Sequence, residues 1–313
     1  MNKVLIIYGP TVTGKTSLSI KLAKKFEGEI ISADSRQVYK KLDIGTGKVS
    51  FDSRVEKYEG YWIVNGVKIH GFDIIGAGKR FTAADFIKIA TLKIKQITDE
   101  NKLPIITGGT GFYINSLLKG INSSGIPSNL KLRQELERLS TEELYKMLAK
   151  LNPARVESMN QSDKKNPRRL IRAIEIATYT NKEPSTVHPL PPTNFLLIGL
   201  TAPNNYLYKK SDIWLETRLE HNLVEEIDSL IKNGVSQEWL DDIGLEYRWI
   251  SRFLTGKTTK PEAQERLKGD IHDLIRRQKT WFNKFKDIKI FDISNPSYFQ
   301  KLEKTVEAWY HSA

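Results

Sequence analysis

GPTVTGKT, residues 9–16, follows a short apolar run at Val4–Ile7 and leads into a helically spaced segment at Lys15–Lys25. When a strand ends in a G-x-x-x-x-G-K-T loop that continues as a helix, the backbone N–H groups and the helix start surround a phosphate. In such a loop Lys15 neutralises the phosphate and Thr16 can ligate Mg²⁺. A glycine turn with a chance lysine is the alternative, but it does not explain the complete spacing. The stretch therefore predicts an α/β fold built around a phosphate-binding loop.

Three more short apolar runs indicate further strands, at Glu29–Ser32, Leu103–Thr107 and Phe195–Leu200. Strands that alternate with helices are typical of a parallel sheet covered by helices on both faces, and ligands bind at the carboxyl ends of its strands. A second glycine-rich stretch, GGTGFY (108–113), follows one of these strands. We therefore expect a P-loop NTPase-like parallel sheet flanked by helices, with both glycine-rich loops at the same edge.

Residues 121–163 change to charged helical patterns, which predicts a helical insertion domain within a catalytic core of residues 1–120 and 164–313. The chain beyond residue 202 is mostly helical in pattern. Single helices are predicted at Asp212–Lys232 and at Pro261–Phe285.

The chain of 313 residues contains no cysteine, which excludes disulfides, thiolate nucleophiles and cysteine-bound zinc. It has neither a membrane-length apolar run nor a signal-peptide core, so we expect a cytoplasmic protein. The net charge is +12, and the basic residues concentrate at 164–172 and 276–289. Uneven positive charge favours a polyanionic partner such as nucleic acid, with a plain solvated helix surface as the alternative.

An enzyme that hydrolyses a nucleoside triphosphate needs a second carboxylate, usually at the end of a strand. Neither Leu103–Thr107 nor Phe195–Leu200 ends in one. Asp34, in EIISADSRQVY (29–39), directly follows a strand and could reach a substrate on the phosphate loop. An Asp in this position could equally cap a local turn, and its position alone does not choose between the two roles.

Several motifs together resemble one family. SADSRQVY (32–39), DIGTGK (43–48), NPRRLIRAIEI (166–176), GLEYR (244–248) and RRQKTWF (276–282) stand beside the two glycine-rich loops. In this order they resemble the tRNA dimethylallyltransferases of bacterial type, and the resemblance covers nearly the whole chain. It implies that the loop holds the diphosphate of dimethylallyl diphosphate and that the adenine next to the anticodon is prenylated on its exocyclic amine.

The resemblance also implies residue roles. Asp34 would be the general base or hydrogen-bond acceptor for the amine, and Arg218 and Lys15 would complete the catalytic set. The diphosphate would lie against Gly9, Thr11, Thr13, Gly14, Lys15 and Thr16, with Mg²⁺ on Thr16, and the prenyl channel against Thr107, Gly108 and Gly109. From the residues alone, Arg218 could instead form a surface ion pair with Glu220 or Glu225, and the paired glycines could simply form a tight turn.

The expected partners are the tRNA anticodon stem-loop and dimethylallyl diphosphate, and we expect a monomer. The predicted tRNA contacts are Asp34, Ser35, Arg36, Gln37, Arg168, Arg169, Arg172, Arg248, Arg277 and Gln278. A stacked adenine is inaccessible, so the target base should flip into the cleft. Apolar spacing along the last long helix also predicts that Ile271, Gln278 and Phe282 point to the core.

The sequence departs from the family pattern in places. Gly47-Lys48-Val49 replaces the usual Ala-Lys-Pro, Gly71 lies in a segment that usually has paired His, and Asn283 replaces an Arg. Two other functions stay open from the residues: a P-loop small-molecule kinase that uses ATP, and a nucleotide-gated RNA-binding protein without chemistry. The kinase would leave the basic segments without a use, and the binding protein would not need Asp34.

Overall fold

The computed structural model describes residues 2–120, 126, 128–179 and 193–312. The chain divides into two compact units. The first contains Met1–Leu118 and Pro189–Ala313, and the second contains Lys119–His188. Each is described by itself.

One eight-stranded sheet, in the order β3-β4-β5-β2-β6-β1-β7-β8, forms the centre of the first unit. Its strands are β1 (Asn2–Tyr8), β2 (Gly28–Ser32), β3 (Val55–Tyr58), β4 (Tyr61–Val64), β5 (Val67–His70), β6 (Leu103–Gly108), β7 (Thr193–Thr201) and β8 (Lys289–Asp292). The four predicted strands β1, β2, β6 and β7 are confirmed, and all the pairings from β5 to β8 along the sheet are parallel.

The predicted parallel sheet is confirmed, and it is extended at one edge by β3, β4 and β5, which pair antiparallel and were not predicted. These three strands are joined by two-residue turns. A connection this short can join only antiparallel neighbours, because parallel strands need a long crossover. The turn between β4 and β5 is Asn65-Gly66, and both residues have positive φ, 52° and 82°. An Asn-Gly turn of this kind is the strongest short hairpin signal in a sequence.

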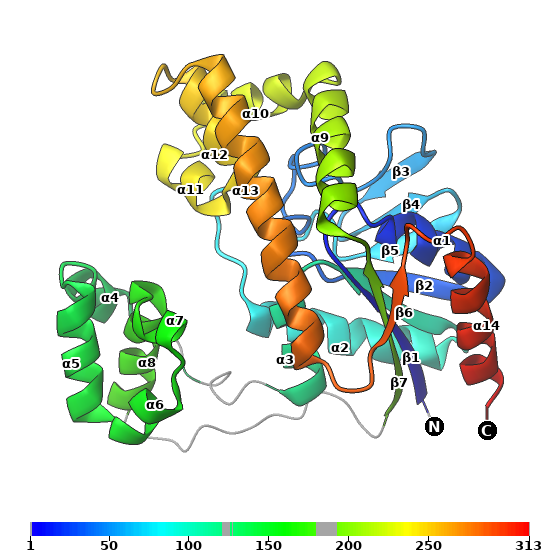
Figure 1. Cartoon of the computed structure of the whole chain (residues 1–313), viewed down its shortest axis with the longest axis horizontal. Helices are drawn as coiled ribbons and strands as arrows, with labels where there is room; N and C mark the ends of the chain where they lie inside the picture. Colours follow the sequence, from blue (N-terminus) through cyan, green and yellow to red (C-terminus); the bar gives the residue numbers. More distant parts are fainter. Residues whose placement is uncertain (1, 121–125, 127, 180–192, 313) are drawn as a thin grey trace. The chain divides into compact units, whose positions relative to one another are not determined.

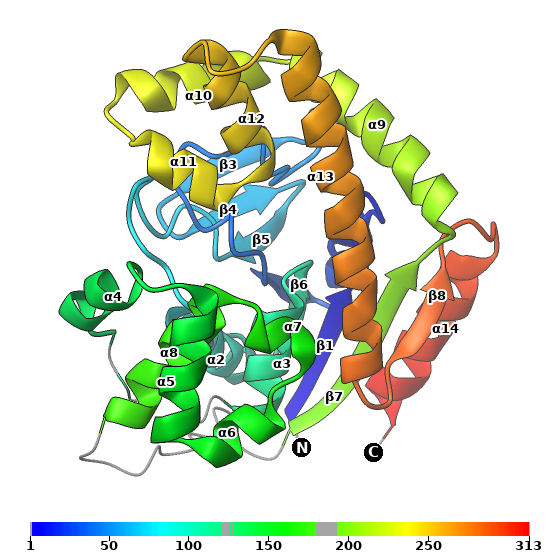
Figure 2. The same ribbon diagram turned by 60° about the vertical axis from the view of Figure 1, so that its left-hand side comes forward.

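Helices cover both faces of the sheet (Figure 1). The helices of this unit are α1 (Lys15–Lys25), α2 (Ala83–Asp99), α3 (Gly111–Lys119), α9 (Asn204–Glu220), α10 (Leu223–Lys232), α11 (Gln237–Ile243), α12 (Leu245–Leu254), α13 (Lys260–Thr280), the 3₁₀ helix η1 (Trp281–Lys284) and α14 (Tyr298–His311). Alternate residues of β1 enter opposite cores, since Leu5 and Ile7 pack with α1 and α14 while Val4 and Ile6 pack with α2 and α3. Figure 2 shows β1 between β6 and β7. This alternation places β1 in the middle of the unit.

Two predicted long helices are each interrupted. The segment predicted as one helix at Asp212–Lys232 is divided between α9 and α10, because Asn222 has a left-handed backbone with φ of 62°. The segment predicted at Pro261–Phe285 leaves the α-helix after Thr280 and continues as η1. The first break turns α10 so that it can approach the segment after β2, which matters for the site below.

The second unit has a core of its own. Its helices are α4 (Leu130–Leu136), α5 (Thr141–Leu151), α6 (Pro153–Ser158), α7 (Gln161–Lys164) and α8 (Pro167–Thr178). Leu144, Leu148, Leu170 and Ile174 are all fully buried in it. The insertion therefore extends past its predicted end at residue 163, because α8 supplies one side of this core; its predicted first residue, 121, lies outside the described residues.

None of the described helices combines the length and apolar character that a membrane crossing requires.

Candidate active site

A cleft of about 1660 Å³ lies in the first unit, where β1, β2 and β6 end. Parallel strands bring their carboxyl ends to one edge, so the loops that follow them face the same space. Lys15, Asp34, Thr107 and Arg218 all line this cleft. Four predicted site residues from four separate sequence segments are thus brought together.

The phosphate-binding loop connects β1 directly to α1. Gly14 is the N-cap residue of α1, in a left-handed conformation with φ of 78°, and the first turn contains no acidic residue. The open N-terminal N–H groups and positive end of such a helix favour an anion. Thr11, Gly14, Lys15 and Thr16 line the cleft. Gly9 and Thr13 are absent from the lining; Thr13 is buried and its hydroxyl donates to Pro10 O at 2.8 Å, so it supports the loop from behind.

The Lys15 ammonium donates to Pro10 O at 2.7 Å. Burial lowers the pKa of Lys15 to about 8, and the Asp34 carboxylate partly offsets this effect. A bound anion stabilises the charged form of such a poorly solvated ammonium group and would raise its pKa again.

Both roles considered for Asp34 are compatible with the structure. Its Oδ1 accepts a hydrogen bond from Arg36 N at 2.9 Å, which caps the turn after β2. The residue also lines the cleft. The neighbouring Ser35 donates its N–H to Thr110 Oγ1 at 3.0 Å, which ties this turn to the loop after β6.

Arg36 and Gln37, both predicted to contact tRNA, line the cleft but also make contacts within the protein. Arg36 Nη1 donates to Glu246 Oε2 at 2.6 Å, and the Glu246 side chain is buried. Gln37 Nε2 donates to Thr46 O at 3.3 Å and to Gly47 O at 3.2 Å. The two side chains therefore shape the wall of the cleft.

Arg218 comes from α9 and is only 6% exposed. Its Nε donates to Ile44 O at 2.7 Å, and its guanidinium lies 3.6 Å from the ring centroid of Trp214. The alternative of a surface ion pair with Glu220 or Glu225 is therefore wrong. Burial lowers the pKa of Arg218 to about 10, against the effect of the Glu246 carboxylate, so the cation is poorly solvated and suited to bind an anion.

Gln278 of α13 connects the two glycine-rich loops. Its Oε1 accepts from Thr11 N at 2.8 Å, and its Nε2 donates to Gly109 O at 3.0 Å. A Cβ at Gly109 would lie 2.3 Å from this Nε2, so the close approach requires glycine. The predicted inward position of Gln278 is confirmed, since it is 8% exposed. Its side-chain amide is bonded to both loops, and the residue also lines the cleft, so Gln278 has a structural role and its tRNA contact stays a prediction.

Thr107, at the end of β6, is 5% exposed, and its hydroxyl has no hydrogen-bond partner among the described residues. Thr107 lines the cleft with Gly108 and Gly109. Its hydroxyl, unpaired within the part of the chain that the structure describes, therefore belongs to the part of the cleft that is predicted to be the prenyl channel.

The remaining predicted tRNA residues lie in two places. Arg248 and Arg277 line the cleft; Arg248 donates from Nε and Nη2 to Asp241 O, and Arg277 is exposed. Arg168, Arg169 and Arg172 belong to α8 in the second unit. Arg169 pairs with Asp163, while Arg172 donates to Glu175 and to Ile126 O.

Sequence reasoning missed two carboxylates, Glu226 and Glu246. Glu226 bonds to the backbone of DIGTGK, and Glu246 pairs with Arg36. Glu246 stands inside the GLEYR motif, which is the one signal that could have drawn attention to it. Glu226 lies in ETRLEHNLVEEI (216–227), a stretch that also follows the family's order, but it is one of several acids on an amphipathic helix and nothing local distinguishes it.

No group of three or more His, Cys, Asp or Glu side chains suited to a metal occurs in the described residues. At phosphate sites Mg²⁺ commonly takes one or two ligands from the protein and the rest from water and substrate phosphate. Thr16, the second residue of α1 and part of the cleft lining, carries a hydroxyl of the required kind.

Comparison with known proteins gives consistent matches. A family model described as IPP transferase matches residues 37–285. A tRNA dimethylallyltransferase of Acetivibrio thermocellus is 37% identical over 298 residues, which cover 92% of this chain and 91% of that protein. The structure of a full-length tRNA isopentenylpyrophosphate transferase from Bacillus halodurans aligns with a TM-score of 0.71 at 30% identity, over 99% of this chain and 97% of that one. A eukaryotic dimethylallyltransferase studied acting on tRNA aligns with a TM-score of 0.78 at 25% identity, over 97% of this chain and 78% of that one.

Proposed function

The chain belongs to the IPP transferase family, and we propose that it transfers a dimethylallyl group from dimethylallyl diphosphate to the N6 amine of the adenine 3′ to the anticodon in tRNA. Diphosphate is the second product. The chain is thus a tRNA dimethylallyltransferase in type, and the phosphate held by its glycine-rich loop leaves the reaction as part of diphosphate.

The observation that carries this proposal is the arrangement of charge around one cleft. The cations of Lys15 and Arg218 and the carboxylate of Asp34 line it together. Departure of diphosphate needs cations around the leaving oxygens, and attack by an amine needs an acceptor for its proton. A kinase of this fold usually has a second carboxylate at a strand end to hold its metal. The strands β6 and β7 end in Gly108 and Thr201 instead.

In the proposed reaction the bond between the allylic carbon and the diphosphate oxygen breaks, and a bond forms between that carbon and N6. The diphosphate takes the electron pair and is stabilised by Lys15, Arg218 and the N–H groups at the start of α1. The amine proton passes to the Asp34 carboxylate. The adenine must leave its stack to reach Asp34, at a cost of roughly a few kcal/mol.

We assign Mg²⁺ to the Thr16 hydroxyl. When bound, this ion neutralises charge on the diphosphate. The prenyl chain is assigned to the floor formed by Thr107, Gly108 and Gly109. The exposed Arg277 and the arginines of α8 are assigned to tRNA phosphates, and we propose that the protein acts as a monomer.

The proposal is tested by single-turnover incubation with radiolabelled dimethylallyl diphosphate, Mg²⁺ and unmodified bulk tRNA, with and without ATP. We expect label in precipitated RNA and no dependence on ATP. Consumption of ATP with no label in the RNA would overturn the transferase and restore the kinase. Binding of tRNA without turnover of either substrate would favour a binding protein.

A further inference from the structure

We propose that Glu226 is a positioning residue that sets the place of Arg218 in the cleft by holding the backbone of residues 43–47. This inference rests on the proposed function, because it assigns Arg218 to the diphosphate. Neither Glu226 nor the backbone it holds was identified from the sequence as part of the site. Residues 43–47 are called the DIGTG segment below.

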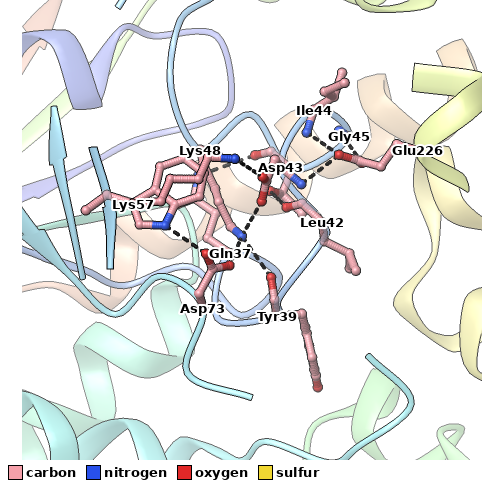
Figure 3. Close-up of polar contacts among 12 residues, drawn as sticks. Gln37, Tyr39, Leu42, Asp43, Ile44, Gly45, Lys48, Lys57, Asp73 and Glu226 are labelled. Carbon is pink, nitrogen blue, oxygen red and sulfur yellow. Dashed lines mark hydrogen bonds and ion pairs between the residues drawn. The ribbon is translucent and has the colours of Figure 1, made fainter. Parts of the chain in front are cut away.

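Glu226 accepts from three consecutive backbone N–H groups of the DIGTG segment (Figure 3). Its Oε2 accepts from Asp43 N at 2.8 Å and from Ile44 N at 2.7 Å, and its Oε1 accepts from Gly45 N at 3.0 Å. The Tyr247 hydroxyl donates to Oε1 at 2.9 Å. Both oxygens thus take two donors each, and only a carboxylate accepts in this pattern.

The other end of the segment is fixed by Lys48, whose side chain is fully buried. Its ammonium donates to Asp43 Oδ1 at 2.7 Å, to Asp73 Oδ1 at 2.6 Å and to Tyr39 O at 2.8 Å (Figure 3). Burial opposes ionisation of Asp43, but the ammonium groups of Lys48 and Lys57 outweigh it and hold the pKa of Asp43 below its ordinary value. The segment is therefore anchored by charge on both sides.

Ile44 transmits the position of Glu226 to Arg218. Its N–H is bound by Glu226, and its C=O accepts from Arg218 Nε at 2.7 Å. In the described part of the chain no other acceptor is assigned to this guanidinium. The N–H and C=O groups of Ile44 therefore connect the Glu226 carboxylate on α10 with the Arg218 guanidinium on α9.

Gly47 limits the guanidinium at its other end. A Cβ at this position would lie 2.4 Å from Arg218 Nη2, and the φ of 60° at Gly47 would strain any other residue. Glycine here, in place of the Ala usual in the family, lets the backbone pass close to Arg218. With Trp214 stacked on the flat face of the guanidinium, the DIGTG segment determines the remaining freedom of Arg218.

Glu226→Gln tests the inference. The amide oxygen of Gln can replace one carboxylate oxygen, but its NH₂ group cannot accept, so the donors on one side lose their partner. A misplacement of about 1 Å can cost roughly 10²-fold in rate. We therefore expect prenyl transfer at saturating tRNA to fall at least tenfold and inorganic diphosphate with Mg²⁺ to bind about tenfold more weakly by calorimetry, while tRNA affinity stays within about twofold.

Glu225→Gln is the matched control, because Glu225 is the exposed neighbour on the same helix and its substitution changes the net charge by the same amount. This variant should leave the rate of prenyl transfer and the affinity for diphosphate unchanged. Equal losses in the two variants would assign the effect to net charge and overturn the positioning role.

A double-mutant cycle with Arg218→Ala separates positioning from general stability. If Glu226 acts through Arg218, Glu226→Gln causes no further loss of diphosphate affinity once Arg218 is removed. Two losses that multiply would overturn the inference.

Tyr247→Phe is the alternative variant should Glu226→Gln not fold. It removes one donor from Glu226 Oε1 and should weaken diphosphate binding about twofold to fivefold. Unchanged diphosphate binding in this variant would also overturn the inference. Absence of prenyl transfer by the unmodified protein would instead count against the proposed function, which diphosphate calorimetry does not test.

Discussion

At the scale of single residues, Asp34 combines a structural contact with a place in the cleft. Its Oδ1 caps the turn after β2 by accepting from Arg36 N. The cap fixes the carboxylate, whose charge interacts with that of Lys15. A base held in this way loses little entropy when the substrate arrives.

Asp34→Asn should reduce turnover by about 10² or more, because general base catalysis typically contributes 10²–10⁴. The Asn side-chain oxygen can still cap the turn, so tRNA should bind as before. Single-turnover transfer and tRNA binding are measured on the same preparation. Unchanged turnover would remove Asp34 from the mechanism.

Lys15 predicts a pH dependence of substrate binding. Its pKa of about 8 means that the free protein carries this charge at pH 7 and loses most of it by pH 9. Affinity for dimethylallyl diphosphate should therefore fall across this range, and binding near pH 8–9 should take up a proton. Calorimetry in two buffers of different ionisation enthalpy measures the uptake.

Lys15→Arg is the control for this dependence, since arginine keeps its charge throughout the range. Any change in the ionisation of the substrate itself affects both proteins equally. A parallel decline in both would show that Lys15 is not the titrating group.

At the scale of elements, α13 holds the site together. Gln278 bonds to the loop after β1 and to the loop after β6, and Tyr8 at the end of β1 donates its hydroxyl to Gln278 O. One helix therefore fixes the separation between the diphosphate loop and the floor of the cleft.

Gln278→Leu should destabilise the protein and weaken diphosphate binding. It leaves Thr11 N–H and Gly109 C=O without their partner, at a cost of about 1–3 kcal/mol. Urea unfolding and diphosphate calorimetry test this. Arg277→Gln, one residue earlier and exposed, should change neither stability nor diphosphate binding and should weaken only tRNA binding. If Gln278→Leu weakened tRNA binding and left stability and diphosphate binding unchanged, Gln278 would be assigned to a direct tRNA contact.

The sequence predicts local elements better than the contacts between distant ones. The strand, loop and helix at residues 2–25 follow from apolar spacing and glycine chemistry. The Asn65-Gly66 pair is a hairpin signal, but a prediction based only on the alternation of strands and helices does not take it into account. The break at Asn222 depends on one residue that tolerates positive φ. By contrast, the bond from Arg218 to Ile44 joins residues 174 positions apart, so local patterns contain no information on it.

At the scale of the whole molecule, the charge of +12 is divided between units that fold around separate cores. In the second unit, Arg169 and Arg172 of α8 differ in their contacts and exposure. Arg172 bonds to Ile126 O and Glu175 within that unit, whereas the Arg169 side chain is 57% exposed. A test of tRNA binding should therefore spare Arg172.

Replacing Arg168 and Arg169 together by Gln should weaken tRNA binding and reduce the slope of log affinity against log salt by roughly two phosphates' worth, about 0.7–0.9 for each. Filter binding over a range of salt concentrations measures the slope. Lys301→Gln with Lys304→Gln removes the same charge from exposed sites on α14 and serves as the control. An equal slope in both double variants would assign these arginines to a solvated surface.

The central place of β1 has a consequence for how the chain is made. β1 pairs with β6 on one side and with β7 on the other, and Val4 to Ile7 are fully buried only when both are present. During synthesis β1 is made well before β7, which begins at Thr193. At about 5–20 residues per second, the nascent strand waits roughly 10–40 s with an apolar edge unpaired. The strand order therefore predicts that β1 is a binding site for chaperones during synthesis.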